Sequence, residues 1–145
     1  MGTSTLMQTE QEHLHKMENV LKKNGYSTTR PRREVLRALL VGGASAARLS
    51  DELLESLDRA TVYRTLTLFE QTGIVNRSVL NSEIYFELSE LFQPHHHHAV
   101  CQLCGRVIDI ASSELELALK NAAADRGFLA VEHSLELRGY CSYCQ

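Results

Sequence analysis

The sequence predicts an α+β fold in two parts, an N-terminal winged helix-turn-helix unit followed by a smaller C-terminal α/β unit. Three observations predict it. Apolar residues recur at helical spacing as far as residue 73, and the segments that follow change to the two-residue period of strands. The last third of the chain then carries two Cys-x-x-Cys pairs, Cys101 with Cys104 and Cys141 with Cys144, which use all four cysteines.

Composition describes an ordinary soluble protein of one or two small domains. The 145 residues are 43% hydrophobic and 23% charged. No apolar run approaches the roughly 20 residues needed to span a bilayer, and residues 1–11 are polar and lack the apolar core of a signal peptide. We therefore expect a cytoplasmic protein with no membrane partner.

Charge is unevenly distributed along the chain. The net charge of −3 argues against a general polyanion binder. Between residues 13 and 40, however, seven cations face two carboxylates, Glu18 and Glu34, a local balance of +5. The cations are Lys16, Lys22, Lys23, Arg30, Arg32, Arg33 and Arg37. This patch can be a nucleic-acid face or simply a solvated helix surface.

The first two helices are delimited by turn residues. Leu14, Met17, Val20 and Leu21 recur at helical spacing, and they predict a helix over about residues 10–23 that Asn24-Gly25 ends. A second helix is expected around Pro31, which a first helical turn accepts, after the capping residues at 27–29. Gly42-Gly43 ends this second helix.

Two shorter helices follow in succession. Ser45 can cap a third helix that runs through Leu54, and Asp58 can cap a fourth that ends near Gly73. The fourth helix is rich in Arg, Thr and Tyr. Two short helices of this kind predict a helix-turn-helix.

A hairpin is expected directly after the fourth helix. The β-prone segments 74–75 and 84–86 are separated by Asn81-Ser82, a turn sequence. A hairpin in this place is a wing. Residues 89–94 then have the character of a hinge, which gives domains at 1–88 and 95–145.

The C-terminal unit has the pattern strand, strand, helix, strand. Strands are expected at 100–103 and 106–110, and a helix from its cap Ser113 to about residue 126, where Gly127 ends it. The last strand, Leu129 to Arg138, alternates strictly, so His133 shares a face with apolar residues. His133 can be a packed core residue or a metal ligand.

The cysteines predict a tetrahedral zinc site. Each Cys-x-x-Cys turn aims two sulfurs at one point, which suits a metal better than the alternatives of two disulfides or four inert buried thiols. The reducing cytosol further disfavours disulfides. The run His95 to His98 lies just ahead of the first pair, and its imidazoles suit a second metal.

Taken together, the motifs resemble the ferric uptake regulator family of metal-responsive repressors. The matching segments are Arg59-Ala-Thr-Val-Tyr-Arg64, Gly73-Ile-Val75, Phe86-Glu-Leu88, the histidine run, Cys101-x-x-Cys104-Gly105 and Gly139-Tyr-Cys-x-x-Cys144. The likeness runs from about residue 14 to the end. It implies a homodimer, not an enzyme, in which a winged-helix DNA-binding domain is joined by a hinge to an α/β dimerisation domain.

The resemblance places Ala60 to Arg64 on the recognition helix. Tyr63 can contact thymine methyl groups, and Arg64 suits a phosphate or a guanine edge. For Tyr63 the alternative is simple packing. The expected DNA-binding residues are Arg30, Arg33, Arg59, Thr61, Tyr63 and Arg64.

The resemblance also assigns three sets of metal ligands. Structural zinc is assigned to Cys101, Cys104, Cys141 and Cys144. A second site is assigned to His95, His97, Glu116 and His133. A hinge sensor is assigned to Glu87, His96 and His98, with Asp109 as a further candidate.

The sequence departs from the family at the sensor. Iron and peroxide sensors tend to have a His where this chain has Gly43-Ala44, and zinc sensors tend to have His or Asp where it has Asn76. We expect Fe²⁺ or Zn²⁺ as the sensed metal, with manganese, nickel and peroxide sensing as alternatives. The expected partner is double-stranded operator DNA, with no small organic substrate.

Two other classes of protein are remote alternatives. One is a zinc-storage or zinc-chaperone protein, which the complete Arg59 to Arg64 segment disfavours. The other is a metallohydrolase, and the sequence has no HExxH pair for it.

Overall fold

The computed structural model describes the backbone of residues 3–145 and the side chains of residues 9–145. Met1 and Gly2, part of the polar segment 1–11 noted in the sequence, therefore lie outside the described residues. The chain divides into two compact units, residues 1–93 and residues 94–145, and each is described by itself. None of the helices described here is both long and apolar enough to cross a membrane.

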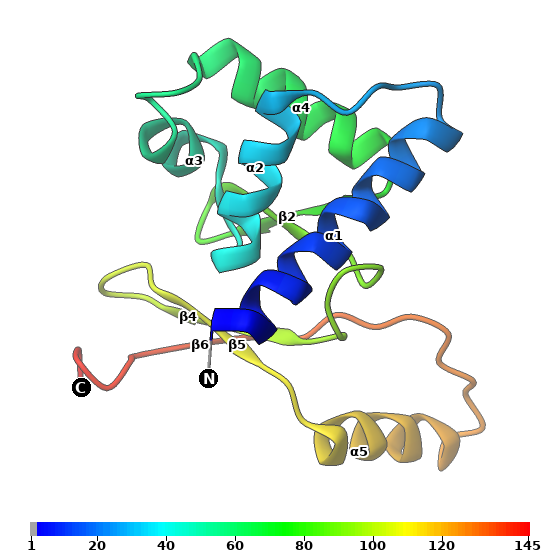
Figure 1. The fold of residues 1–145 in the computed structure, drawn as a ribbon. Helices are drawn as coiled ribbons and strands as arrows, with labels where there is room; N and C mark the ends of the chain where they lie inside the picture. Colours follow the sequence, from blue (N-terminus) through cyan, green and yellow to red (C-terminus); the bar gives the residue numbers. More distant parts are fainter. Residues whose placement is uncertain (1–2) are drawn as a thin grey trace. The chain divides into compact units, whose positions relative to one another are not determined.

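Four helices build most of the N-terminal unit (Figure 1): α1 (Thr3–Lys23), α2 (Arg30–Val41), α3 (Ala46–Glu52) and α4 (Arg59–Gln71). Helix α1 begins well before the predicted residue 10. The prediction rested on apolar spacing that starts at Leu14, and a polar first segment gives no such signal although it can be helical. Helix α3 ends at Glu52, and Leu54, expected within it, is 68% exposed.

The predicted caps of the two short helices are confirmed. Ser45 Oγ accepts a hydrogen bond from the backbone N–H of Arg48 at 3.3 Å, and the Asp58 carboxylate accepts one from the N–H of Thr61 at 2.9 Å. Each bond satisfies a donor that a helix start leaves open. Asp58 therefore fixes where α4 begins.

A three-stranded sheet follows the helices. Its order is β1 (Ala44–Ser45), β3 (Glu83–Leu88), β2 (Val75–Leu80), all antiparallel. Asn81 and Ser82 both have left-handed φ values, 49° and 65°, as a two-residue hairpin turn requires. The predicted hairpin is confirmed, whereas β1 is a strand that the sequence did not predict.

The hydrophobic core of this unit lies between the helices and one face of the sheet. Its largest fully buried side chains are Phe69, Met17, Leu21, Leu36, Leu39, Leu49, Leu66 and Ile74. Helix α4 contributes Val62, Leu66 and Phe69, which are at most 1% exposed. The predicted buried stripe is confirmed, and the opposite face of α4 is left to the solvent.

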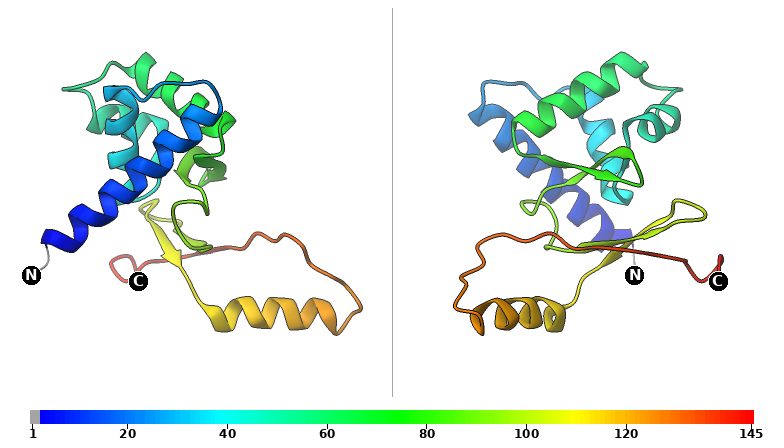
Figure 2. Two further views of the ribbon diagram at one scale, coloured as in Figure 1. Left: turned by 45° about the vertical axis from the view of Figure 1, so that its right-hand side comes forward. Right: turned by 180° about the vertical axis from the view of Figure 1, so that it is seen from behind.

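The C-terminal unit contains β4 (His97–Cys101), β5 (Val107–Ile110), α5 (Ser113–Ala124) and β6 (Glu136–Gly139). The strand order is β5-β4-β6, and β6 runs parallel to the central β4 with His98 level with Glu136. Figure 2 shows α5 set apart from these strands, and none of its side chains is buried. Strand β4 begins three residues before the predicted start.

Two predictions in this unit were wrong. The last strand covers only residues 136–139, and Leu129 and Val131, expected on its buried face, are 84% and 91% exposed. Alternation alone does not make a strand, because a strand also needs a neighbour to hydrogen-bond, and pairing with β4 starts at Glu136. The cap of α5 is Ser112, whose Oγ accepts from Leu115 N–H at 3.2 Å, and not Ser113.

The buried side chains of the C-terminal unit are mostly polar or metal-binding. They are His97, His98, Val100, Cys101 and Cys141. Four of these five belong to the predicted ligand sets. Within a single chain, a core of this composition supplies little hydrophobic stabilisation, so we expect bound ions to contribute to the stability of the unit.

Candidate metal centres and DNA-reading helix

The four cysteines converge at one end of the C-terminal sheet, where the parallel strands β4 and β6 both end. Cys101 ends β4, Cys104 lies in the turn after it, and Cys141 and Cys144 follow β6. The four Sγ atoms all lie within 4.8 Å of one another, and Cys104 Sγ is 3.8 Å from Cys141 Sγ. In a tetrahedral zinc site with Zn–S bonds of about 2.3 Å, neighbouring sulfurs are about 3.8 Å apart. The four-cysteine cluster fits structural zinc.

The cysteines of this cluster differ in how readily they ionise. Backbone N–H groups of Cys104 and Cys141 directed at its sulfur lower the pKa of Cys101 to about 6. Contacts with the Cys141 and Cys104 thiols raise the pKa of Cys144 to about 12. One thiolate is thus favoured and another opposed, so four thiolates can coexist only around a positive ion.

A second cluster joins three imidazoles and one carboxylate. His97 Nε2 lies 2.7 Å from Glu116 Oε1, and His133 Nε2 lies 3.2 Å from Glu116 Oε2. His133 Nε2 is also 3.3 Å from the Nε2 atoms of both His95 and His97. Ligands about 2.0–2.1 Å from a metal in a tetrahedron are about 3.3 Å apart. Three ring nitrogens aimed at one point suit a divalent cation.

Glu116 is held in its charged form. Burial raises its pKa, but the hydrogen bond from His97 and the nearby imidazoles of His133 and His95 outweigh burial and lower the pKa of Glu116 below its ordinary value. The carboxylate therefore remains available as a ligand in mildly acidic solution. His133 lies outside any strand, yet it reaches the cluster that the sequence predicted.

The predicted sensor residues fall on both units. His96 Nε2 and His98 Nε2 lie 3.9 Å and 3.8 Å from Asp109 Oδ1, and the two imidazole rings meet edge to face. Asp109 is on β5, directly across from His98 on β4. Glu87 belongs to β3 of the N-terminal unit. The alternation along the histidine run thus separates His95 and His97 from His96 and His98.

The exposed face of α4 carries the predicted DNA-reading residues. Tyr63 is 45% exposed, so its ring is not part of the core, and Arg64 beside it is exposed as well. Thr61 is engaged locally, because its hydroxyl donates to Asp58 and accepts from Arg64 at 3.1 Å. Arg59 pairs with Asp51 of α3 at 3.2 Å.

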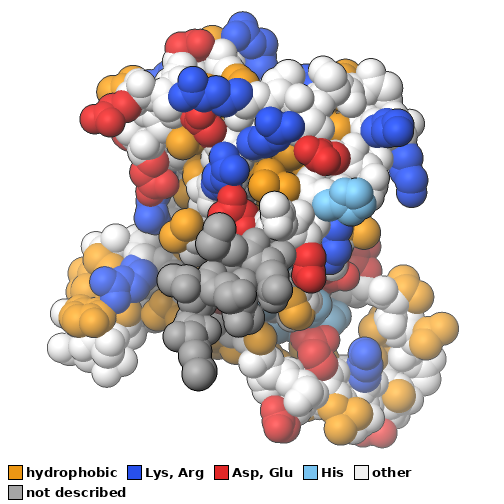
Figure 3. Space-filling view, in the orientation of Figure 1, with side chains coloured by type: hydrophobic (Ala, Val, Ile, Leu, Met, Phe, Trp, Pro, Cys, Tyr) orange, Lys and Arg blue, Asp and Glu red, His pale blue; other side chains and the backbone are white. Residues whose placement is uncertain are grey.

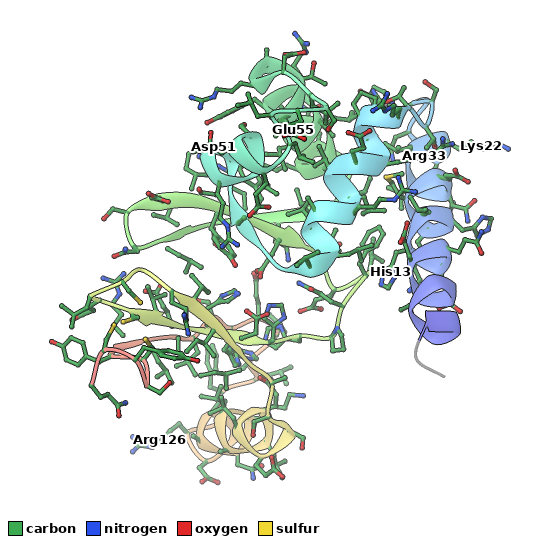
Figure 4. The ribbon with its side chains drawn as sticks, turned by 60° about the vertical axis from the view of Figure 1, so that its left-hand side comes forward. His13, Lys22, Arg33, Asp51, Glu55 and Arg126 are labelled. Atoms are coloured by element: carbon green, nitrogen blue, oxygen red, sulfur yellow. The ribbon has the colours of Figure 1, made fainter. Side chains whose placement is uncertain are left out.

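The basic patch is partly neutralised by neighbouring acids. Arg30 pairs with Glu34 at 2.6 Å, and Arg33, labelled in Figure 4, approaches Glu18 of α1 at 3.6 Å. On the face shown in Figure 3, Lys and Arg side chains are interspersed with Asp and Glu over the helices. The Arg33–Glu18 pair is exposed on both sides and is therefore weak, whereas the Glu34 side chain is only 16% exposed.

One set of contacts had no signal in the sequence. From α1, His13 Nε2 lies 2.9 Å from the carbonyl oxygen of Phe92, and Lys16 Nζ donates to that of Leu91 at 3.3 Å. The acceptors are backbone atoms, which no residue pattern reveals. Helix α1 is thereby tied to the segment expected as a hinge.

These features define a class of protein: a winged-helix DNA-binding protein with metal centres in a separate α/β unit. The profile of the ferric uptake regulator family matches residues 23–138 of the chain. The chain belongs to this family, whose members are metal-responsive, dimeric, DNA-binding regulators of transcription.

Known relatives cover most of the chain. The ferric uptake regulation protein of Escherichia coli K12 is 38% identical in an alignment of 129 residues, and the match covers 84% of this chain and 86% of that protein. The Vibrio cholerae ferric uptake regulator matches in structure with a TM-score of 0.70 and 36% identity, over 86% and 98% of the two chains. A zinc uptake regulator complexed with zinc and DNA matches with a TM-score of 0.55 and 31% identity, over 92% and 93%.

Proposed function

We propose that this chain is a repressor of metal-uptake or metal-homeostasis genes whose DNA binding depends on Fe²⁺ or Zn²⁺. The observation that carries the proposal is that the histidines at and just before β4 belong to two imidazole–carboxylate clusters. Strand β4 is the first strand after the segment 89–94. Neighbouring histidines of β4 belong to different clusters, so metal binding at either cluster acts on the same strand.

In this proposal the three sets of ligands have different tasks. The four cysteines hold structural zinc. His95, His97, Glu116 and His133 hold a second ion that orders α5 and the segment before β6 around β4. Glu87, His96 and His98, with Asp109 as a further oxygen ligand, hold the regulatory metal. Imidazole and carboxylate together are ligands that Fe²⁺, Mn²⁺ and Zn²⁺ accept.

The switch follows from where these side chains are anchored. A bound cation attracts a carboxylate and imidazoles to one point. Glu87 belongs to the wing and His98 to β4. We propose that residues 89–94 permit several arrangements of the chain, and that a bound metal favours the one in which both side chains are ligands. Favouring it sets the two recognition helices of a homodimer to successive major grooves, about 34 Å apart. By reciprocity, operator DNA tightens metal binding by the same factor.

Removing the wing ligand is expected to uncouple DNA binding from metal. In Glu87→Ala and His98→Ala proteins, metal should no longer tighten operator binding, whereas it should do so by about tenfold or more in the wild type. Operator affinity would be measured by fluorescence anisotropy while Fe²⁺ (anaerobically), Zn²⁺ and Mn²⁺ are titrated in turn. The metal effective at the lowest free concentration identifies the signal.

The matched control for this experiment is Glu83→Ala. Glu83 lies on the same strand as Glu87, is exposed, and loses the same charge. It should keep the metal dependence of the wild type. Unchanged metal dependence in both Glu87→Ala and His98→Ala would reject the regulatory role of this set.

The second cluster should lose its ion when a buried ligand is removed. His97 is 3% exposed and hydrogen-bonded to Glu116. We expect His97→Ala to weaken binding of one metal equivalent by more than about 100-fold while leaving the cysteine-bound zinc in place. Metal content by mass spectrometry and competition with a chromogenic chelator measure both. His15→Ala, an exposed histidine on α1, should lose nothing.

A further inference from the structure

The segment that leaves the N-terminal unit, residues 89–93 (the exit segment), is held by that unit at both ends. At its start, Ser89 N–H donates to the carbonyl oxygen of Ile74 at 3.0 Å, and Ser89 Oγ donates to that of Gly73 at 2.7 Å. At its end, the Phe92 side chain is 6% exposed and belongs to the hydrophobic core of the unit. The exit segment is therefore anchored through backbone, hydroxyl and apolar contacts.

Helix α1 supplies donors to the last carbonyl groups of the exit segment. Phe92 N–H donates to the carbonyl oxygen of Ser89 at 2.8 Å, which closes a single turn. The carbonyl groups at the end of such a turn have no partner within it. Lys16 Nζ donates to the carbonyl oxygen of Leu91 at 3.3 Å, and His13 Nε2 lies 2.9 Å from that of Phe92. Basic side chains are favourable at this end of a turn.

His13 lies between two carbonyl oxygens. The Nδ1 atom of His13, which is labelled in Figure 4, is 2.5 Å from the carbonyl oxygen of Thr9 on α1, and Nε2 faces that of Phe92. A carbonyl oxygen only accepts hydrogen bonds, and a neutral imidazole has one N–H where the charged form has two. In either neutral tautomer, a nitrogen lone pair would face an oxygen lone pair. The two contacts of His13 therefore require its doubly protonated form.

The imidazole ring also packs on the residue whose carbonyl it binds. The rings of His13 and Phe92 are stacked, with centroids 6.1 Å apart and planes 20° from parallel. If a neutral ring turns to separate the lone pairs, this contact is lost as well. Loss of one proton thus acts on the carbonyl group and on the side chain of Phe92 together.

The fixed charges near these contacts do not compete with His13 as titrating groups. Imidazoles change charge between about pH 5 and 8, whereas carboxylates, amines and guanidinium groups in general keep their charge from about pH 6 to 8. The charged groups within a turn of the contacts are Glu10, Glu12 and Lys16 on α1, Arg37 on α2, which pairs with Glu10 at 2.7 Å, and Glu90 in the exit segment. A second imidazole of α1, His15, is exposed. Rising pH therefore weakens the hold on the exit segment through His13.

We propose that His13 is a positioning residue that, in its doubly protonated form, fixes the exit segment against α1. The bonds of Ser89 persist when His13 is neutral, so residues 90–93 are the part that loosens. The consequence for regulation rests on the proposed function, in which the chain between the wing and β4 permits several arrangements. That freedom begins at Pro94 when the exit segment is fixed and at residue 90 when it is loosened. Protonation of His13 thus narrows the set of arrangements from which a bound metal selects.

Amide hydrogen exchange of the full-length protein, with its cysteine zinc retained, tests this hold. Exchange is followed by NMR at about pH 6 and about pH 8 and corrected for the intrinsic rate at each pH. In the wild type, protection of the Phe92 amide should be about fivefold or more higher at the lower pH, because a charged donor is lost at the higher one. In His13→Ala it should be low at both. The Ser89 amide should stay equally protected in both proteins, and His15→Ala is the matched control that should behave as the wild type.

Two further measurements separate protonation from packing alone. Ring-nitrogen chemical shifts should show His13 losing its second proton over the pH range in which protection of the Phe92 amide falls. His13→Lys keeps a positive charge throughout, so its Phe92 amide should be protected equally at both pH values. Lys16→Met removes a donor whose charge is constant, and it should lower the protection by the same factor at both.

Equal protection of the Phe92 amide in the wild type and His13→Ala at about pH 6 would overturn the inference. Protection that stays constant in the wild type while His13 loses its proton would overturn it as well. The exchange is read without operator DNA, so neither result depends on the regulatory metal. If exchange follows the expectation while Glu87→Ala and His98→Ala keep metal-dependent operator binding, the proposed function is rejected and the hold by His13 stands.

Discussion

Cys141→Ser protein is expected to lose its zinc and the folded state of its C-terminal unit. Cys141 is 6% exposed, its sulfur lies 3.8 Å from that of Cys104, and its N–H donates to Cys101 Sγ. Structural zinc contributes apparent binding free energies of about 10–16 kcal/mol in small zinc-dependent domains. Within one chain, a unit whose buried side chains are mostly ligands has few apolar contacts to replace that contribution.

The loss is measured in three ways on the full-length protein. Zinc content should fall to near zero, limited proteolysis should remove residues beyond about 94, and sedimentation should show loss of the dimer. Ser142→Ala, an exposed change inside the same Cys-x-x-Cys turn, is the control and should behave as the wild type. Retention of stoichiometric zinc and of protease resistance by Cys141→Ser would contradict a structural role for the four-cysteine cluster.

Tyr63→Ala and Arg64→Ala are expected to weaken specific operator binding strongly without unfolding the protein. Both side chains lie on the exposed face of α4, whereas the core side of the helix is formed by Val62, Leu66 and Phe69. Loss of a base contact costs about 1–3 kcal/mol in affinity per site, and a dimer loses it twice. Operator affinity should therefore fall by about 30-fold or more while Tm is nearly unchanged.

The two variants should differ in how their affinity depends on salt. If Arg64 contacts phosphate, Arg64→Ala lowers the slope of log affinity against log salt by about one per contact, and Tyr63→Ala leaves it unchanged. Arg126→Ala is the matched control, since Arg126 is an exposed arginine beyond α5 in the other unit (Figure 4). Operator binding by Tyr63→Ala at wild-type affinity would mean that another face reads DNA.

The sequence predicted those helix starts and turns that are determined by the residues at the start or turn itself. Helix α4 begins at Asp58 because a carboxylate there caps it, and the hairpin turns at Asn81-Ser82 because these residues accept left-handed backbone. The ligand clusters could be predicted for a related reason. Metal ligands must be particular residue types at particular spacings, so Cys-x-x-Cys pairs and alternating histidines remain visible in the sequence.

Features that depend on a distant partner could not be predicted in this way. Strand β1 has two residues and exists only because β3 pairs with it. Residues 129–135 alternate as a strand would, but no neighbour pairs with them in the described part of the chain. Glycine at 43 was interpreted as a helix terminator, and the sequence did not show that a Cβ atom there would lie 2.5 Å from Cε1 of Tyr85 on β3.

The composition of the C-terminal interior has a consequence for how the newly synthesised chain folds. Cys101, Cys141, His97 and His98 make up nearly all of the buried side chains in residues 94–145. If the ligands of this unit hold ions as proposed, a newly made chain is expected to complete the unit only after those ions have bound. We therefore expect the number of working regulators in a cell to follow the zinc supply at the time of synthesis, before any regulatory metal is sensed.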